Sequence, residues 1–312
     1  MPQTNLPRIA VLLPCYNEEA AIGATVRGFR EALPGATVYV YDNNSRDRTC
    51  EIAADAGAVV RTEKQQGKGH VVRRMFADID ADVYVMADGD LTYDPAAAPK
   101  MVDMLRAEQL DMVVGTRVHE AKDAYRGGHV LGNKVFTGLL AGLFGRSFSD
   151  IFSGYRVFSR RFVKSFPVLS AGFEIETEMS VHALELRMPV GEMVTSYGAR
   201  PEGSQSKLST YGDGWKILKM IGTLYRVERP VLFYGAIGAL LVIAAILLAI
   251  PLVRTYLATG LVPRFPTAIL VTGMTIIAVL CFFAGLILDT VTRGRREVRR
   301  LAYLSLRAPG EV

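Results

Sequence analysis

Two long apolar segments near the C-terminal end restrict most strongly what this chain can fold into. Val231–Ile250 and Thr267–Leu288 contain no charged residue, and each has about the 20 residues that a helix needs to cross a bilayer. A helix buried in a soluble core is expected to keep a polar face, and neither segment has one. We therefore predict that both segments are transmembrane helices.

Arginine residues predict the orientation of this helical hairpin. Arg226 and Arg229 precede the first segment, whereas the loop between the segments carries only Arg254 and Arg264. A cluster follows the second segment: Arg293, Arg295, Arg296, Arg299 and Arg300. Because loops rich in Lys and Arg stay in the cytoplasm, we expect both ends of the hairpin there. Before it, Trp215–Val227 mixes basic and apolar residues, which predicts an amphipathic helix at the membrane surface or packed on the domain.

Charge and cysteine usage narrow the class of protein. The net charge is +5, and much of the arginine lies after residue 290, so an anionic membrane surface is a better partner than nucleic acid. The first ten residues lack the basic region and apolar run of a cleaved signal peptide, and we expect the first domain to be cytoplasmic. Cys15, Cys50 and Cys281 have no metal or disulfide spacing and are predicted to be free thiols.

The residues before the hairpin alternate between strand and helix patterns, which predicts an α/β fold with a mostly parallel sheet covered on both faces. Strands are expected at Arg8–Leu13, where Pro14 ends the run, and at Ala36–Tyr41, Ala58–Arg61, Val83–Ala87, Met112–Gly115 and Val190–Tyr197. Helices are expected at Ala20–Leu33, Asp47–Ala56, His70–Ile79, Ala96–Glu108, Val130–Phe144 and Glu174–Arg187. Ligands of such sheets bind at the carboxyl ends of the strands.

A pair of carboxylates follows the strand Val83–Ala87. Asp88 and Asp90 both follow the end of this strand. Such a pair suits Mg²⁺ or Mn²⁺, whose coordination shell keeps positions open for water and substrate phosphate. Aspartate beside glycine is also an ordinary turn, which is the alternative for an isolated motif. A calcium loop is excluded, because Tyr93 and Pro99 stand where it needs Gly and Glu.

Other polar loops are predicted at the same sheet edge, and together they would form a nucleotide-sized cleft. These are Pro14–Glu18, Asp42, Lys68 and Thr116–Arg117. The chain has neither G-x-G-x-x-G after the first strand nor a P-loop, so it lacks both diagnostic motifs. Gly67-Lys68-Gly69 by itself is more typical of a flexible loop than of a phosphate contact.

The ordered motifs resemble family 2 glycosyltransferases of the GT-A fold, and more narrowly the polyprenyl-phosphate glycosyltransferases related to dolichol-phosphate mannose synthase. The resemblance covers about residues 8–210 and rests on these segments: Pro14-Cys15-Tyr16-Asn17-Glu18-Glu19, Asp42-Asn43-Asn44-Ser45, Gly67-Lys68-Gly69, Asp88-Gly89-Asp90, Gly115-Thr116-Arg117 and Ser153-Gly154-Tyr155-Arg156. The hairpin is similar to that of bacterial members. We accordingly expect a GT-A domain at 1–210, an amphipathic helix at 211–229, the hairpin at 230–290 and a basic cytoplasmic tail at 291–312.

The resemblance implies a role for each site residue. The nucleotide sugar would contact Pro14, Tyr16, Glu18, Asp42, Lys68 and Asp88. Asp88 and Asp90 would hold Mg²⁺ or Mn²⁺, and with Arg117 they would form the catalytic set. The acceptor phosphate would contact Arg117, Lys134, Arg200, Ser206 and Lys207, of which Lys134 fits the family pattern more loosely.

These roles imply inverting transfer of a sugar, with a UDP-sugar favoured, to a polyprenyl phosphate such as undecaprenyl phosphate. The product would serve cell-envelope glycan assembly at a bacterial inner membrane, in a multi-pass protein with its catalytic domain and both termini in the cytoplasm. Two alternatives stay open: transfer to a hydroxyl acceptor, with Asp150 or Glu174 as base, and a silent scaffold that binds nucleotide. A homo-oligomer is also compatible with the sequence, because Gly235 and Ala239 permit close helix packing.

Overall fold

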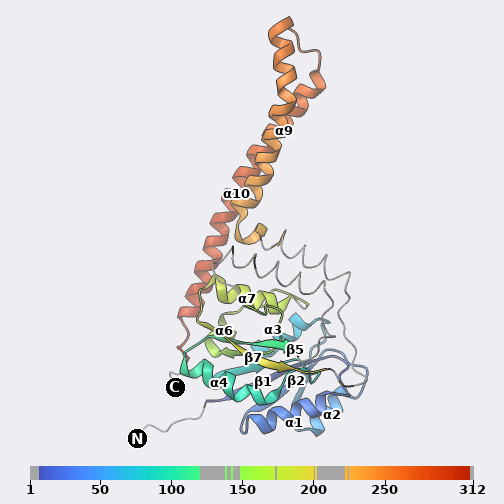
Figure 1. Cartoon of the computed structure of the whole chain (residues 1–312), viewed down its shortest axis with the longest axis vertical. Helices are drawn as coiled ribbons and strands as arrows, with labels where there is room; N and C mark the ends of the chain where they lie inside the picture. Colours follow the sequence, from blue (N-terminus) through green and yellow to red (C-terminus); the bar gives the residue numbers. More distant parts are fainter. Residues whose placement is uncertain are drawn as a thin grey trace. The chain divides into compact units, whose positions relative to one another are not determined.

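The computed structural model describes residues 7–119, 138, 142, 148–172, 174–199, 201, 222–223 and 225–309 (Figure 1). The chain divides into two compact units. The first contains Met1–Asp213 together with Arg299–Val312, and the second contains Gly214–Val298. The first unit carries the α/β fold and the second carries the apolar hairpin.

The first unit is built on a seven-stranded sheet with the order β3-β2-β1-β4-β6-β5-β7. Its strands are β1 (Ile9–Cys15), β2 (Thr37–Asp42), β3 (Val59–Thr62), β4 (Val83–Met86), β5 (Met112–His119), β6 (Arg156–Ser159) and β7 (Val190–Tyr197). All pairs are parallel except those of β6, which runs antiparallel to β4 and β5. The predicted mostly parallel sheet is confirmed, and the antiparallel strand is an addition to it.

Pro14 does not end the first strand as predicted, since β1 continues to Cys15. Its pairing with β4 ends at Leu12, whereas its pairing with β2 continues to Cys15 opposite Asp42. Pro14 therefore lies beyond the last residue paired with β4, and its missing N–H removes no bond from that ladder.

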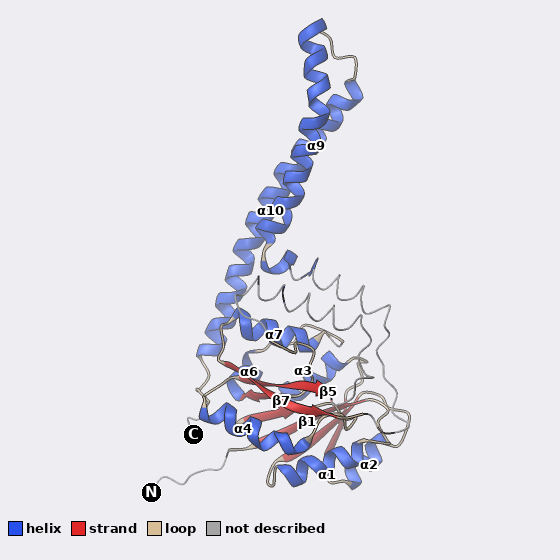
Figure 2. Ribbon diagram, viewed as in Figure 1, coloured by secondary structure: helices blue, strands red, loops and turns tan. Residues whose placement is uncertain are grey.

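Helices cover both faces of the sheet (Figure 2). They are α1 (Ile22–Ala32), α2 (Thr49–Asp55), α3 (Lys68–Asp78), α4 (Ala98–Ala107) with the preceding turn η1 (Pro95–Ala97), α6 (Arg160–Ser165) and α7 (Ile175–Glu185). The expected helices that fall within the described residues are present with shifted ends, and α6 was not expected. The helix predicted at Val130–Phe144 lies outside the described residues apart from Gly138 and Gly142, as does most of the one predicted at Trp215–Val227.

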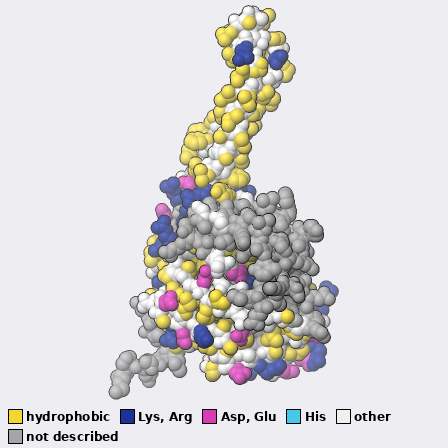
Figure 3. Space-filling view, in the orientation of Figure 1, with side chains coloured by type: hydrophobic (Ala, Val, Ile, Leu, Met, Phe, Trp, Pro, Cys, Tyr) yellow, Lys and Arg dark blue, Asp and Glu magenta, His cyan; other side chains and the backbone are white. Residues whose placement is uncertain are grey.

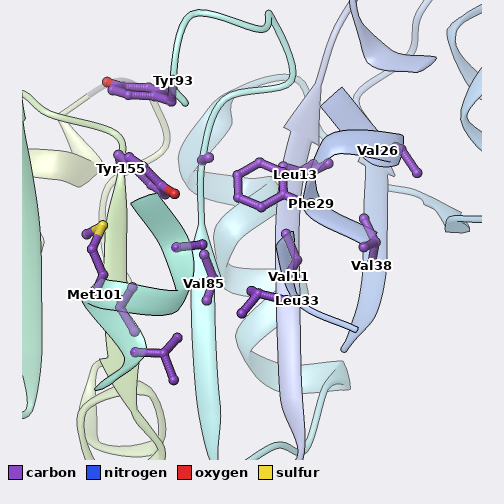
Figure 4. Close-up of a cluster of buried hydrophobic side chains, with 14 of the residues drawn as sticks. Val11, Leu13, Val26, Phe29, Leu33, Val38, Val85, Tyr93, Met101 and Tyr155 are labelled. Atoms are coloured by element: carbon purple, nitrogen blue, oxygen red, sulfur yellow. The ribbon is translucent and has the colours of Figure 1, made fainter. Parts of the chain in front are cut away.

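The hydrophobic core fixes the sheet edge that carries the polar loops. Val11 and Leu13 of β1 and Val85 of β4 pack against Phe29 of α1, and Phe29 meets the ring of Tyr155 edge-on at a centroid distance of 6.2 Å (Figure 4). These side chains are fully buried. Burying an aromatic or aliphatic side chain contributes roughly 1.5–3 kcal/mol, so the strand ends that bear the site are held rigidly.

The second unit contains two long apolar helices, α9 (Pro230–Thr259) and α10 (Phe265–Leu304), whose turns up to Val298 belong to this unit. Both are long and apolar enough to cross a membrane, and hydrophobic side chains cover their surface (Figure 3). Both extend past the predicted spans. α9 continues through Pro251 and ends before Gly260, whose φ of 69° is typical of a helix terminus.

The last turns of α10, from Arg299, belong to the first unit, where a basic tail was expected. Arg299 Nη1 lies 2.6 Å from Glu185 Oε2, and Arg300 donates to the carbonyl of Leu186. These turns therefore pack on the C-terminal end of α7. As predicted, Cys15, Cys50 and Cys281 are thiols outside any disulfide bond.

Candidate active site at the carboxyl edge of the sheet

The loops after β1 and β2 bind each other. The backbone N–H of Asn17 donates to Ser45 Oγ at 2.8 Å, and Arg46 N donates back to Asn17 Oδ1 at 2.8 Å. The N–H of Glu18 donates to Thr49 Oγ1 at 2.8 Å. Asn17 has a positive φ of 52°, which asparagine tolerates better than most residues. The two loops therefore form one rigid wall of the site.

This wall carries the residues that the sequence associated with the nucleotide. Pro14 and Asp42 lie at neighbouring strand ends, where Pro14 is in register with Tyr41 and Cys15 with Asp42. The carboxylate of Asp42 accepts from the N–H of Ser45 at 3.1 Å, and Glu18 is buried. Pro14, Tyr16, Glu18 and Asp42 thus belong to adjacent, cross-linked segments.

The Gly67-Lys68-Gly69 segment is packed tightly, so its interpretation as a flexible loop is wrong. Gly67 has a φ of 135°, and a Cβ atom there would lie 2.2 Å from the carbonyl oxygen of Ala171. A Cβ on Gly69 would lie 2.1 Å from the carbonyl oxygen of Ser170, and Gly69 N donates to Ala171 O at 3.0 Å. Only glycine permits this backbone contact on both sides of Lys68.

The Lys68 ammonium lies between two carboxylates. Its Nζ is 2.5 Å from Asp88 Oδ1 and 2.5 Å from Glu176 Oε1. Burial by itself would lower the pKa of Lys68, but the two carboxylates outweigh it and hold the pKa above its usual value. Glu176 lies on α7, where no sequence motif identifies it as a partner of Lys68.

The two aspartates after β4 differ in their surroundings. Asp90 is buried, and its Oδ1 accepts from Thr92 N at 3.2 Å and from Thr92 Oγ1 at 2.6 Å. Between them, a Cβ on Gly89 would lie 2.4 Å from Cys15 Sγ, which ties this turn to the end of β1. A Cβ on Gly154 would lie 2.9 Å from Asp88 Oδ2, so that glycine keeps space beside the carboxylate.

The donor set fits a hard cation only in part. In the described part of the chain, no group of three His, Cys, Asp or Glu side chains is placed to hold a metal. Asp88 and Asp90 supply two carboxylates from one turn, and Mg²⁺ or Mn²⁺ often uses just one or two, with substrate phosphate and water completing the shell. The residues therefore suit a cation that a phosphorylated substrate completes.

Arg117 lies at the end of the site formed by β5 and β7. Its Nε and Nη2 donate to Asp150 at 2.7 and 2.8 Å, and its guanidinium lies 5.5 Å from the ring centroid of Tyr197. Burial tends to raise the pKa of Asp150, but the hydrogen bonds from Arg117 dominate and lower it. Asp150 is thus held ionised in a bidentate pair, which does not suit the role of general base that the alternative reading gave it.

Buried hydrogen bonds hold the segment Ser153–Arg156 in place next to the site. Arg156 is fully buried and donates to the carbonyls of Ser153 at 2.9 Å and Ile151 at 2.6 Å. Burial lowers its pKa to about 10. The N–H of Gly154 donates to the hydroxyl of Tyr93 at 2.8 Å, which joins this loop to the turn after Asp90.

The structure brings together part of the predicted site. Lys68 and Asp88 are in direct contact, and Asp90 follows in the same turn, whereas Arg117 is bound to Asp150. The remaining residues expected at the acceptor phosphate are outside the described ranges: Lys134, Arg200, Ser206 and Lys207.

The model of glycosyl transferase family 2 matches residues 10–166, from β1 through α6. The chain belongs to glycosyl transferase family 2. Among relatives of this family 2 member, the glycosyltransferase AglJ of Haloferax volcanii is 35% identical over 74% of this chain and 76% of AglJ. Dolichyl-phosphate hexose transferase of the same organism is 27% identical, over 73% of this chain and 99% of its own length.

A solved structure confirms the predicted GT-A-like α/β fold. Glucosyl-3-phosphoglycerate synthase from Mycobacterium tuberculosis, crystallised with Mn²⁺, UDP and glucosyl-3-phosphoglycerate, superimposes with a TM-score of 0.58 at 23% identity. The match covers 70% of this family 2 glycosyltransferase and 79% of the synthase. At this identity the likeness concerns the fold.

Proposed function

We propose that this glycosyltransferase moves a sugar from a nucleotide diphosphate, with UDP favoured, to the phosphate of a polyprenyl lipid such as undecaprenyl phosphate, with inversion at the anomeric carbon. The proposal rests mainly on one observation: the carboxylate pair Asp88 and Asp90 occurs in the same chain as two helices that are long and apolar enough to cross a membrane. The likeness to dolichyl-phosphate hexose transferase over 99% of that protein's length supports a lipid-linked acceptor.

The donor would bind along the wall formed by the β1 and β2 loops. Pro14, Tyr16, Glu18 and Asp42 would contact the nucleoside, and Lys68 would face the diphosphate. Asp88 and Asp90 would hold Mg²⁺ or Mn²⁺, which neutralises charge that develops on the departing diphosphate. The crystals of the Mycobacterium synthase with Mn²⁺ and UDP support this use of a GT-A edge.

The acceptor phosphate would approach from the side of Arg117. A phosphate monoester is anionic at neutral pH and needs no base to become a nucleophile, which agrees with the engagement of Asp150 by Arg117. Arg117, Lys134, Arg200, Ser206 and Lys207 would position this phosphate. We place the catalytic domain (1–210), the amphipathic helix (211–229) and the basic tail (291–312) at the cytoplasmic face of a bacterial inner membrane, with 230–290 crossing it.

The test uses the full chain purified in detergent. Labelled UDP- and GDP-sugars are offered one at a time with undecaprenyl phosphate, with Mn²⁺, Mg²⁺ or EDTA. Undecaprenol serves as the matched acceptor, because it has the same lipid chain but ends in a hydroxyl. We expect one donor to give an organic-extractable sugar lipid with the phosphate acceptor alone, and EDTA to abolish it.

Two results would contradict the proposal. Transfer to undecaprenol or to a glycan hydroxyl, with none to the lipid phosphate, would favour a hydroxyl acceptor. Absence of turnover with every donor, in protein that is folded by circular dichroism, would favour a nucleotide-binding scaffold.

A further inference from the structure

The contact between Lys68 and Asp88 has a consequence for metal binding. The ammonium of Lys68 is bound to the carboxylate that would hold the cation, and to Glu176 at the same distance of 2.5 Å. The side chains of Lys68 and Glu176 are 8% and 6% exposed, whereas that of Asp88 is 32% exposed. A ligand that enters from solvent therefore meets Asp88 first, with Lys68 and Glu176 behind it.

Backbone contacts and hydrogen bonds connect the segment that carries Lys68 to the helix that carries Glu176. The glycines on both sides of Lys68 pack against the backbone of Ser170 and Ala171. The N–H groups of Leu169 and Ser170 donate to the Glu178 carboxylate at 2.8 and 2.7 Å. Because Glu178 lies on α7, as Glu176 does, the segment that positions Lys68 is tied to the helix that carries its second carboxylate.

Asp88 belongs to a different segment, the turn after β4. A change at Asp88 can therefore leave the Lys68–Glu176 pair in place. A divalent cation that binds Asp88 while Lys68 is present must lie near an ammonium group, and like charges at a few ångströms repel strongly in a partly buried site. Negative charge brought by a diphosphate would offset that repulsion.

We propose that Lys68, positioned by Glu176, makes divalent-cation binding at Asp88 depend on the diphosphate of the donor. Without nucleotide, Lys68 acts as the resident cation of Asp88 and keeps the affinity for free metal low. With the diphosphate present, Asp88 turns to the metal, and Lys68 keeps its contact with Glu176 and donates to a diphosphate oxygen. This inference rests on the proposed use of a nucleotide diphosphate and a metal.

The role given to Glu176 is positioning. Its carboxylate binds the Lys68 ammonium at the same distance as Asp88 does and so helps to hold it in place. Removal of Glu176 takes away one of the two carboxylates that hold the ammonium, so the ammonium competes more strongly with a metal for Asp88. Removal of Lys68 has the opposite effect, because it leaves the two carboxylates close together with no ammonium between them.

The experiment measures Mn²⁺ binding by the loss of the free-ion electron paramagnetic resonance signal, on full-length protein with and without UDP. We expect wild type to bind Mn²⁺ at least tenfold more tightly with UDP than without it. Lys68→Met should tighten the UDP-free affinity at least tenfold, about 1.4 kcal/mol. Glu176→Gln should weaken the UDP-free affinity about threefold or more.

Two further variants separate this effect from misfolding and from general charge. Lys68→Met/Glu176→Gln removes both partners, avoids leaving the carboxylates of Asp88 and Glu176 together without the Lys68 ammonium, and should bind UDP-free Mn²⁺ between wild type and Lys68→Met. Lys100→Met removes an exposed lysine of α4 and should leave Mn²⁺ binding within twofold of wild type. Opposite signs for Lys68 and Glu176 are not expected if both residues only stabilise the fold.

Two outcomes would overturn the inference in distinguishable ways. If wild type binds Mn²⁺ with UDP but Lys68→Met and the double variant bind UDP-free Mn²⁺ no more tightly than wild type, Lys68 does not set the dependence. If wild type does not bind Mn²⁺ even with UDP, the proposed metal use itself is wrong.

Discussion

Two carboxylate clusters occupy opposite edges of the same sheet. The turn after β4 carries Asp88, whereas Asp111 lies directly before β5. Both strands run antiparallel to β6, so they are parallel to each other, and the end of one lies at the edge opposite to the start of the other. The two clusters can therefore be compared within one fold.

The Asp111 cluster is balanced in charge and closed to solvent. Asp111 is 0% exposed and accepts from Ser159 Oγ at 2.7 Å, Arg161 Nη2 at 2.8 Å and the Tyr303 hydroxyl at 2.8 Å. The Arg161 guanidinium also lies 4.3 Å from the ring centroid of Tyr303. One carboxylate thus meets one guanidinium, with hydroxyls completing the hydrogen bonds.

The Asp88 cluster shares a single ammonium and is partly open to solvent. One ammonium, from Lys68, serves two carboxylates, those of Asp88 and Glu176. Breaking a buried ion pair is costly, and charged groups with perturbed pKa values in a cleft are candidates for a functional site. The comparison teaches that a cluster closed to solvent suits a structural role, whereas a carboxylate that shares one ammonium and faces solvent suits a ligand site.

The largest effect is expected on stability, at Asp111. Asp111→Ala leaves the Arg161 guanidinium mostly buried without its carboxylate, which should cost about 3–5 kcal/mol. Thermal unfolding of the detergent-solubilised protein measures this loss, and transfer activity per folded molecule should be unchanged. The control is Asp103→Asn, which alters an exposed aspartate of α4. If Asp111→Ala unfolds at the same temperature as this control, Asp111 does not stabilise the fold.

The next effect is expected on activity, at Asp88. Asp88→Asn removes a proposed metal ligand and should lower transfer about 10²–10³-fold, because the charge on the leaving diphosphate is no longer offset. The unfolding temperature should stay near that of wild type. Turnover close to that of the Asp103→Asn control would count against a metal role for Asp88.

Mild acid should lower the stability of the folded protein through His182. Burial, and then the nearby Arg299, lowers the pKa of His182 to about 3 from its usual 6.5. Below pH 6.5 the unfolded chain binds a proton that the folded chain does not, so stability falls as the pH drops. The loss between pH 7 and pH 5 should be about 2 kcal/mol.

His182→Gln tests this pH dependence, because it removes the titrating ring. The variant should lose less stability than wild type between pH 7 and pH 5, whereas His70→Gln should behave like wild type. Equal losses in wild type and His182→Gln would show that another group is responsible.

The smallest effect is expected at Tyr303. Tyr303→Phe removes the hydroxyl that donates to Asp111 but keeps the ring under Arg161, so a loss of about 1.5 kcal/mol is expected. Denaturant unfolding with and without Asp111→Ala would show the coupling. If the Tyr303→Phe loss is as large in Asp111→Ala as in wild type, the hydrogen bond is not its source.

The sequence predicted the grouping of Lys68, Asp88 and Asp90 at one sheet edge better than the residues that support them. Asp88, Asp90 and Lys68 follow strands or open a helix, so the alternating pattern already places them at one sheet edge. Glu176 was missed because its partner Lys68 is 108 residues away and no local pattern marks the pair. A position in a helix says little about which distant side chain it meets.

Two errors have local physical causes. β6 was missed because its four residues begin with the buried Arg156, which interrupts the apolar pattern of a strand. Gly67-Lys68-Gly69 taken by itself suggests a flexible loop, because glycine is common both in mobile loops and at close backbone contacts. The contact with Ser170 and Ala171 became visible only in the folded chain.

The most direct measurement is the anomalous scattering of Mn²⁺ in crystals of the full chain grown with UDP. We expect a manganese peak at coordination distance from a carboxylate oxygen of Asp88 or Asp90, with the diphosphate on its other side and Lys68 still bound to Glu176. Manganese and UDP bound away from this turn, with the Lys68–Asp88 contact intact, would contradict the assignment of the site.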